Sequence, residues 1–337
     1  MVSVYKLLAL VLPLLGFFSS LNKDQQEYTI NGFAQGTSYT IKYFAVKPVI
    51  TKSAIDSILT DIDASMSLYQ PNSLINKFNA STDGVVLDAQ FKAVMGKAFE
   101  IYKDTQGKFD VTVGPLVQAW GFGPKPITEF PDSLTIRKLL NIVGMDGLEL
   151  KGDFLKKKVP GIQVDLNGIA QGYSVDVVAD YLSRLGITSF VVEIGGELRV
   201  KGLKPDGSGR RIGIEGPALT PLAEPQIRHI INITDGAVTT SGNYRKWIQK
   251  GSKKITHLID PSTGYPLDNQ LISATIYAKD AITADGYDNA VMAMDVKEAI
   301  RFIESNGNME AYLIYHQEDG KIADTLTKGF KKMIVDK

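Results

Sequence analysis

The chain has 337 residues, of which 44% are hydrophobic and 22% charged, and this composition suits one large globular domain or two smaller ones. Its 37 Lys and Arg residues balance its 37 Asp and Glu residues, so neither a basic nucleic-acid-binding face nor a polybasic membrane patch is indicated. The absence of cysteine excludes disulfides and thiolate chemistry, and only three histidines argue against a multi-His zinc site.

The N-terminus is typical of an export signal. Lys6 precedes an apolar run over residues 7–18, and the small residues Ser19 and Ser20 follow it. These features predict a secretory signal or an N-terminal anchor over residues 1–21. The run is short for a transmembrane helix, and whether it is cleaved or stays as an anchor is open. No cysteine follows it, so a lipid anchor is not supported. We expect one domain over residues 22–337.

The first half of this domain predicts strands followed by helices. Residues 27–44 alternate in part around Gly32 and Gly36, which predicts a strand pair or a bent strand. Helical spacing of apolar residues predicts helices over residues 53–65, 90–105 and 133–143, and Ser73 can cap a short helix that ends near Phe78. Residues 107–124 are rich in Gly, Pro and aromatic residues. This favours a shaped, irregular pocket wall, although a buried loop held by Trp120 would look the same.

Residues 161–176 predict a strand, a tight turn at Gly168 and the start of a helix that ends at Gly186. Backbone N–H groups at a helix start attract phosphate, and glycine allows a ligand close to the backbone. The glycine spacing matches neither a P-loop nor a dinucleotide fingerprint. Close packing of a helix on a strand explains these glycines equally well.

The second half of the chain is richer in predicted strands. Two β segments flank Gly195 within residues 189–201, further strands lie within residues 212–240, and a final strand pair spans residues 311–330. The polar residues 239–245 can bring hydroxyls and amides to a site, and His257 lies in a loop after a strand end. A helix is predicted over residues 297–305. The fold expected is a single α+β domain, with helices packed on a mixed or antiparallel sheet.

One predicted helix, over residues 283–294, has two distinct faces. Tyr287 and Val291 belong to an apolar stripe, whereas Asp285, Asp288 and Asn289 share a polar face. Two carboxylates and an amide oxygen within reach of one point suit Mg²⁺ or Ca²⁺. The alternative is that Asp285 only complements the helix dipole and Asp288 is solvated. The helix start is expected to be capped by Thr283.

Seven short motifs, in order along residues 32–294, resemble those of the ApbE family, the FAD:protein FMN transferases. The motifs are Met66-Ser-Leu-Tyr with Ser73 and Phe78-Asn79, Phe109-Asp-Val-Thr-Val-Gly-Pro-Leu with Trp120-Gly-Phe-Gly, Val164-Asp-Leu-Asn-Gly-Ile-Ala-Gln-Gly-Tyr with Asp176, Glu193-Ile-Gly-Gly-Glu, Thr240-Ser-Gly-Asn-Tyr, His257-Leu-Ile-Asp-Pro-Ser-Thr-Gly and Thr283-Ala-Asp. Each motif is weak alone, but seven in register are specific. The resemblance implies an ApbE-like, T-fold-like architecture.

The resemblance also implies an exported enzyme that binds FAD and Mg²⁺. The family cleaves the FAD pyrophosphate, joins FMN through its phosphate to a threonine of an acceptor protein, and releases AMP. The acceptor threonine lies in a short Asp-rich, Ser/Thr-Ala-Thr motif of a membrane redox protein, so we expect the chain at the periplasmic side of the inner membrane. The matching metal positions are the Gly168 carbonyl, Asp285 and Asn289, with Asp288 as a further candidate. The matching FAD positions are Gln35, Tyr69, Lys108, Phe109, Asp110, Asp165, Gln171, His257 and Leu258.

Several positions depart from the commoner family pattern. Gly168 stands where alanine is usual, Asn289 where threonine is common, and Gln35 where methionine is. Gln171 stands where lysine is common, which removes a positive charge near the anionic cofactor. Cofactor affinity is therefore the property that these departures put in question.

For proton transfer, His257 is the first candidate because it titrates near neutrality, and Asp165 is the second. Two other functions remain open from the sequence. One is an FAD pyrophosphatase that gives FMN and AMP with water as acceptor, and the other is a periplasmic flavin-binding protein without turnover.

Overall fold

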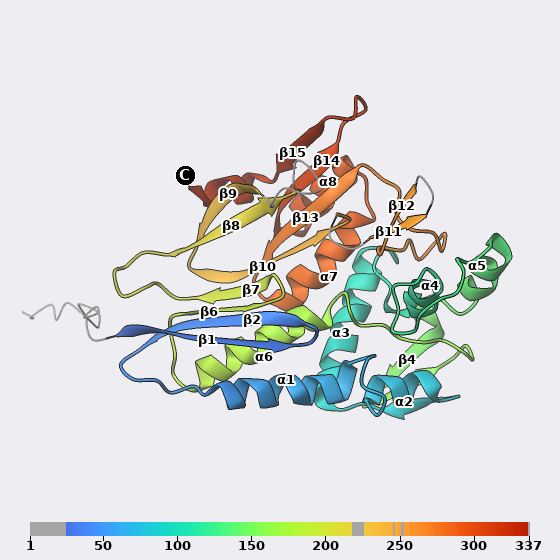
Figure 1. The fold of residues 1–337 in the computed structure, drawn as a ribbon, viewed down its shortest axis with the longest axis horizontal. Helices are drawn as coiled ribbons and strands as arrows, with labels where there is room; N and C mark the ends of the chain where they lie inside the picture. The colour runs from blue at the N-terminus through green and yellow to red at the C-terminus, as the bar shows by residue number, and fades with distance from the viewer. Residues whose placement is uncertain (1–24, 218–225, 245–246, 251–252, 336–337) are drawn as a thin grey trace, which may run out of the picture.

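An antiparallel β-sheet forms the centre of the computed structural model, which describes residues 25–217, 226–244, 247–250 and 253–335 (Figure 1). Every neighbouring pair of strands in this sheet runs antiparallel. In spatial order, its strands are β1 (Gln26–Ala34), β2 (Thr37–Ala45), β6 (Phe190–Ile194), β7 (Glu197–Lys201), β10 (Asp235–Gly242), β13 (Leu271–Ala278), β14 (Glu310–His316) and β15 (Ile322–Leu326).

Smaller sheets and the helices surround this sheet. The smaller sheets have the orders β16-β9-β8, β3-β5-β4 and β11-β12. Their strands are β3 (Gly84–Val86), β4 (Leu148–Lys151), β5 (Phe154–Lys157), β8 (Arg210–Gly216), β9 (Gln226–Ile233), β11 (Trp247–Lys250), β12 (Lys253–Thr256) and β16 (Ile334–Val335). The helices are α1 (Lys52–Met66), α2 (Leu74–Ala80), α3 (Ala89–Asp104), α4 (Gly114–Ala119), α5 (Ser133–Leu140), α6 (Ala170–Arg184), α7 (Ala281–Met292), α8 (Val296–Asn306) and α9 (Lys328–Met333).

The central sheet is buried on both faces because its side chains alternate between two cores. On β14, Leu313 packs into the larger core, and Tyr312 and Ile314 pack into the second core. The larger core also takes the buried faces of α1, α3, α6 and α7. The second core is closed by β8, β9 and α9. Figure 1 shows this layering, with α1 and α6 below the strands β1 and β2, and β8 and β9 above.

The apolar periodicity of the sequence explains the helices of the larger core. On α1, Ile55, Leu59 and Ile62 are buried, at the spacing that puts side chains on one face of a helix. Capping side chains then fix where helices begin. Ser73 accepts a hydrogen bond from Asn76 N at the start of α2, as a Ser N-cap does.

The structure confirms the fold class expected from the sequence, a single α+β domain with an antiparallel sheet and packed helices. The predicted strand pair over residues 27–44 is the β1–β2 hairpin. The predicted helices correspond to α1, α2, α3, α5, α6, α7 and α8, and the two β segments around Gly195 are β6 and β7. The predicted signal or anchor, residues 1–21, lies outside the described residues.

Four local predictions were wrong. Residues 107–124 line a cavity as expected, but they are not irregular throughout, since they contain a 3₁₀ turn (Val111–Val113) and α4. Pro115 lies in the first turn of α4, where proline is tolerated. Residues 162–166 belong to no strand, and residues 167–169 form a turn before α6. Residue 330 belongs to α9 and not to a strand. Asp280, not Thr283, is the side-chain cap of α7, and it accepts from the Thr283 N–H at 3.1 Å.

The residues before α6 are held by a side chain in place of a strand partner. The Asn79 amide donates to Val164 O at 2.9 Å, and its Oδ1 accepts from Val164 N at 2.7 Å. Asp165 N then donates to Val111 O at 2.7 Å. This pairing satisfies the backbone that a sheet would satisfy elsewhere, and it fixes the segment that leads to Gly168.

Within the part of the chain that the structure describes, none of the helices is long and apolar enough to cross a membrane.

Candidate active site

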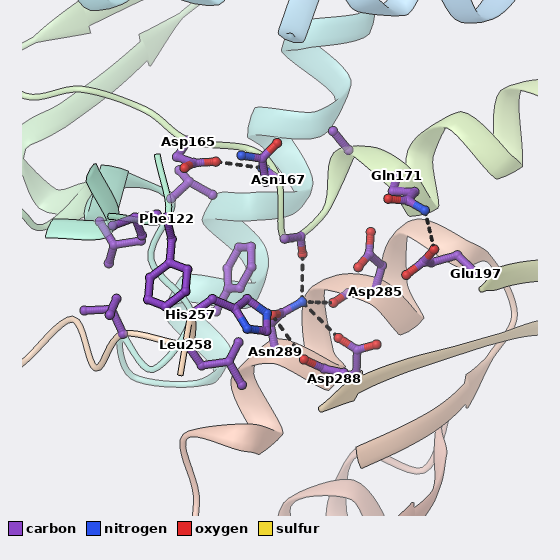
Figure 2. A pocket seen from close by; sticks show the side chains of 18 of the residues that line it. Phe122, Asp165, Asn167, Gln171, Glu197, His257, Leu258, Asp285, Asp288 and Asn289 are labelled. Carbon is purple, nitrogen blue, oxygen red and sulfur yellow. Dashed lines mark hydrogen bonds between the residues drawn. The ribbon is translucent and has the colours of Figure 1, made fainter. Parts of the chain in front are cut away.

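One cavity of about 770 Å³ collects all the site residues expected from the sequence. Segments that lie far apart in the chain form its wall, namely the β1–β2 turn, the end of α1, the start of α6, the β6–β7 turn, the end of β10, the loop after β12 and α7. Figure 2 shows Gln171, Glu197, Asp285 and Asp288 on one side of the view, and Asp165, Phe122 and Leu258 on the other. The lining includes Gln35, Tyr69, Lys108, Phe109, Asp110, Asp165, Gly168, Gln171, His257, Leu258, Asp285, Asp288 and Asn289.

Oxygen atoms surround the side-chain amide of Asn289 on α7. Its Nδ2 lies 3.2 Å from Gly168 O, 3.0 Å from the backbone oxygen of Asp285 and 3.0 Å from Asp288 Oδ1 (Figure 2). A primary amide has two hydrogens, so it cannot satisfy three acceptors at once. Rotation of the amide by half a turn brings Oδ1 to the same place and completes a set of oxygens of the kind that hard divalent cations prefer.

The carboxylates beside this amide are buried and crowded. Asp285 is 4% exposed and Asp288 1% exposed, so the alternative that Asp288 is a solvated surface residue is wrong. Burial raises the pKa of Asp285 to about 7. Burial, and then repulsion from Asp285, raise the pKa of Asp288 well above its usual range. Two carboxyls with raised pKa values in one cavity indicate a site that a cation would stabilise.

No three His, Cys, Asp or Glu side chains group together as cation ligands among the described residues. A cation at this position would therefore need the Gly168 carbonyl and the Asn289 amide oxygen besides the two carboxylates. Gly168 follows the segment that Asn79 holds, and Asn289 lies on the helix α7. Both are rigid supports, as a cation site requires.

The start of α6 differs from the phosphate-binding end that the sequence suggested. Gly172 N donates to Asp285 Oδ2 at 2.7 Å, and the N–H groups of Ile169 and Ala170 donate to Leu166 O. These three donors are therefore already used within the protein. Neutralisation of an anionic ligand depends correspondingly more on a cation and less on this helix end.

Gln171 also bonds within the protein. Its Nε2 donates to Ile194 O at 2.8 Å and to Glu197 Oε2 at 2.6 Å (Figure 2). The amide thus ties the start of α6 to the β6–β7 turn. Because an amide adds no charge, the acidic side of the cavity keeps the negative charge of Glu197.

His257 also lines the cavity, half-buried, in the loop after β12. Its ring meets the edge of Phe122, with ring centroids 6.2 Å apart. Turn hydrogen bonds around Asp260 order this loop, including Gly264 N to Asp260 O at 2.8 Å, and Trp120 Nε1 fastens it by donating to Gly264 O at 2.8 Å. The buried Trp120 therefore helps to hold the loop that carries His257.

Two of the expected flavin positions, Asp110 and Lys108, also make contacts within the protein. Asp110 is buried and accepts hydrogen bonds from Thr112 N at 2.7 Å and Met145 N at 3.2 Å. Burial nevertheless raises the pKa of its carboxyl. Lys108 Nζ lies 3.4 Å from the backbone oxygen of Ala293 and 3.4 Å from Glu298 Oε1. The ammonium lines the cavity at the end of α7, where a helix C-terminus favours a positive charge.

Other expected positions lie at the rim and on the floor. Gln35 occupies the two-residue β1–β2 turn in a left-handed conformation, with φ of 53°, as such hairpin turns require. Its Nε2 donates to Ser174 Oγ at 2.9 Å. Tyr69 is 65% exposed at the rim. Asp165 accepts from Asn167 N at 2.9 Å, and desolvation raises the pKa of its carboxyl.

Asp63 lines the cavity although sequence reasoning did not name it for the site. Met66 also lines it and appeared only as a letter of a motif, and Val117 appeared only within the predicted pocket wall of residues 107–124. Asp63 lies on α1 among residues predicted only as a helix, and desolvation raises the pKa of its carboxyl. Glu197 appeared only as a letter of a motif. Nothing in the local pattern marks Asp63 or Glu197 as site residues, because only the tertiary packing brings α1 and β7 to the cavity.

Comparison with known proteins identifies the family of this chain. The model of the ApbE family matches residues 35–313. A FAD:protein FMN transferase of Vibrio cholerae is 37% identical over 309 residues, which are 88% of this chain and 90% of that protein. One from Haemophilus influenzae is 34% identical over 330 residues, 94% of each chain.

Solved structures give the same result. The flavin transferase ApbE from Vibrio cholerae superposes with a TM-score of 0.82 at 35% identity, and the match covers 92% of this chain and 99% of that one. The flavinyl transferase ApbE of Pseudomonas stutzeri, in its apo form, also gives 0.82, at 31% identity, and covers 92% and 97%. Motif order, sequence match and fold agree, so the chain belongs to the ApbE family.

Proposed function

We propose that this chain is an FAD:protein FMN transferase, which uses Mg²⁺ to transfer FMN from FAD to a threonine of an acceptor protein. The threonine oxygen forms a bond to the phosphorus of the FMN moiety. The bond from this phosphorus to the bridging oxygen of the pyrophosphate breaks, and AMP leaves with that oxygen. The threonine proton passes to a base.

The observation that carries this proposal is the cavity itself. It brings an oxygen set fit for a hard cation and a histidine held by an ordered loop into one space of about 770 Å³. A pocket of this size suits a small-molecule ligand, and a pyrophosphate needs its charge neutralised. The relatives named above supply the identity of the reaction.

The residues that would hold Mg²⁺ are Asp285, Asp288, Asn289 through its amide oxygen, and Gly168 through its carbonyl. These donors fit the ion because they are all oxygens and because the two carboxylates are buried. When bound, the ion supplies charge neutralisation at the pyrophosphate. The chain itself keeps the donors in place through the hydrogen bond from Gly172 N to Asp285 Oδ2.

We propose His257 as the group that accepts the proton of the acceptor threonine. Threonine Oγ is a weak nucleophile, so it needs a base or close positioning. The ring of His257 faces the cavity from an ordered loop, and imidazole titrates near neutral pH. Asp165 is the second candidate, because its raised pKa also favours proton transfer. The other expected FAD positions, which include Gln35 and Leu258, would shape the pocket and bind FAD.

Two measurements test this function. Protein mixed with FAD, Mg²⁺ and an acceptor protein carrying a Ser/Thr-Ala-Thr motif should release AMP and leave covalent flavin on the acceptor in a denaturing gel. AMP release that needs no acceptor and labels none would identify a pyrophosphatase instead. FAD binding without any AMP would identify a flavin-binding protein without turnover.

Asp285→Ala tests the cation site. We expect it to abolish Mg²⁺-dependent AMP release, while circular dichroism shows an intact fold, because one of the two buried acidic ligands is lost. Normal turnover in this variant would remove Asp285 from the site.

We further propose that the reaction takes place outside the cytoplasm, at the periplasmic side of the inner membrane, on a membrane redox subunit. The basis for export is the composition of residues 1–20, whereas the membrane redox subunit as acceptor is what the family resemblance implies.

A further inference from the structure

The first turn of α7 donates two of its hydrogen bonds to a side chain of another helix. The opening N–H groups of a helix have no acceptor within it. In α7, Thr283 N donates to the Asp280 side chain at 3.1 Å, and Ala284 N donates to Asp280 O at 3.2 Å. The two remaining donors, Ala281 N and Ile282 N, donate to the two oxygens of Asp176 at 3.0 and 2.9 Å.

Asp176 lies on α6 and is 8% exposed. Besides the two N–H groups of α7, its Oδ1 accepts from Arg199 Nη1 on β7 at 2.7 Å. Burial raises the pKa of Asp176, and the hydrogen bonds and Arg199 oppose this rise. A buried carboxylate with three donors from two elements is a fixed point between α6, α7 and β7.

The connection between the two helices is reciprocal. Asp176 of α6 binds the start of α7, and Asp285 of α7 binds Gly172 N near the start of α6 at 2.7 Å. The helices touch between these bonds. A Cβ built on Gly172 would lie 2.4 Å from Ala281 O and 2.7 Å from Asp285 Cβ. The bond made by Asp176 therefore sets how far α7 can slide or turn against α6.

The position of α7 on α6 matters because the oxygen ligands of the proposed cation come from both sides of the contact between these helices. Gly168 precedes α6, whereas Asp285, Asp288 and Asn289 lie on α7, and the Gly168 O to Asn289 Nδ2 distance is 3.2 Å. Asp176 does not line the active cavity. Any effect it has on the cation must therefore pass through the position of α7.

We infer that Asp176 is a positioning residue for the cation site: its carboxylate holds the start of α7 at the register on α6 that brings Asp285, Asp288 and Asn289 to the Gly168 carbonyl. The inference rests on the proposed Mg²⁺ site. It concerns a residue that touches neither the ion nor FAD, and it assigns to the buried Asp176–Arg199 pair a role beyond stability.

Asp176→Asn and Asp176→Ala test this inference. Asn keeps one carbonyl oxygen, which can serve one N–H of α7, whereas Ala leaves both N–H groups and Arg199 without this acceptor. Asp180→Asn is the matched control. Asp180 lies one turn further along α6, 60% exposed and 3.9 Å from the same Arg199, and it makes no hydrogen bond to α7 among the described residues.

Mg²⁺ is titrated into each full-length protein, with and without FAD, and the rise in melting temperature gives the half-saturating concentration. FAD affinity without Mg²⁺ is measured by flavin fluorescence. We expect Asp176→Ala to raise the half-saturating Mg²⁺ concentration about 10- to 100-fold, the usual effect of losing a support of a metal ligand. Asp176→Asn should lie between Ala and wild type. Asp180→Asn should have the wild-type half-saturating Mg²⁺ concentration. FAD affinity measured without Mg²⁺ should be the same in all variants as in wild type.

A lower melting temperature with an unchanged Mg²⁺ response would overturn the inference, because that is what a purely structural ion pair predicts. The inference is also overturned if Asp180→Asn weakens Mg²⁺ binding as much as Asp176→Ala does. If Asp285→Ala abolishes the Mg²⁺ response and Asp176→Ala keeps it, the positioning role alone fails. If the wild-type protein itself shows no Mg²⁺ response, the proposed cation site fails and the inference falls with it.

Discussion

At the scale of single residues, His257 is the sharpest test of the mechanism. If it takes the proton of the acceptor threonine, His257→Ala should lower the flavinylation rate by about 10²- to 10⁴-fold, the usual worth of general acid–base catalysis. FAD binding should weaken much less. The measurement is the rate as a function of FAD concentration, with a melting curve beside it.

Other roles of His257 give other results. A side chain that only contacts FAD would raise the KM, and saturating FAD would then restore most of the rate. A side chain that only packs on Phe122 would lower the melting temperature and leave both kinetic parameters near normal. Phe122→Leu is the control, because it removes the ring edge beside His257 and keeps the imidazole.

The buried pair of carboxylates predicts how Mg²⁺ binding depends on pH. Asp285 has a pKa raised to about 7 by burial, and a cation binds only the ionised form. Below this pH the proton competes with Mg²⁺, so the half-saturating Mg²⁺ concentration should rise by up to about tenfold for each pH unit. Mg²⁺ titrations by thermal shift between pH 5.5 and about 8.5 measure this dependence. Asp285→Asn should weaken binding and flatten the dependence.

The same pKa has a consequence for the stability of the metal-free protein. Between the ordinary pKa of an aspartate, 3.8, and about 7, the folded state holds a proton on Asp285 that the unfolded state has lost. The contribution of this group to stability is therefore full below the lower value and is lost as pH rises through the upper one. Added Mg²⁺ should raise the melting temperature more at pH 8 than at pH 6.

Individual residues of the site could be named from the sequence, but their partners could not. Every expected position lines the cavity. Asp110, however, bonds to Met145 N, and Gln171 bonds to Ile194 O and Glu197. These partners are 23 or more residues away in the chain, so no local pattern distinguishes a residue that binds a ligand from one that holds a turn.

At the scale of elements, α7 shows what periodicity can and cannot predict. The apolar stripe and the polar face were both predicted, since each follows from the 3.6-residue repeat. The polar face was expected to meet either a cation or solvent. It lines the cavity and packs against α6 and β10, so the solvated alternative is wrong. Periodicity defines a face, whereas its neighbour depends on the rest of the fold.

The contact between α6 and α7 predicts opposite outcomes for two glycines. In Gly172→Ala, the new Cβ would meet the backbone oxygen of Ala281 at 2.4 Å, so the helices must separate. Overpacking of this kind costs about 1–3 kcal/mol, which should outweigh the gain of about 1 kcal/mol from the helix propensity of Ala. We expect a lower melting temperature and weaker Mg²⁺ binding.

Gly168→Ala is the matched control, a Gly-to-Ala change four residues earlier. Its Cβ would meet nothing closer than Asn289 Nδ2 at 3.4 Å, which is ordinary contact, and its carbonyl is kept. Both melting temperature and Mg²⁺ binding should stay near wild type. Equal damage in the two variants would show that the close approach at Gly172 is not what holds the helices in place.

At the scale of the whole molecule, the order of the strands was beyond sequence reasoning. β2 pairs with β6, and β7 with β10, across long stretches of chain, and no residue pattern encodes such pairing. β13 lies near the centre of the sheet, and nearly all of its residues are buried, so it lacks the alternation that marks a half-buried strand. The fold class could be predicted because it depends on element types, not on their order.

The last prediction also concerns the whole molecule, and it is the export of the chain. Lys6 and the apolar run over residues 7–18 predict membrane targeting, whereas the cores are built from residues 39–330. Targeting and folding should therefore depend on different parts of the chain.

Cells that produce the full chain with a C-terminal tag should hold it outside the cytoplasm, soluble or membrane-bound. A version without residues 2–21 should stay in the cytosol, with the same melting temperature and the same AMP release. Mass spectrometry of the exported chain shows whether residues 1–21 are cleaved. Detection of the full chain in the cytosol alone would contradict the prediction.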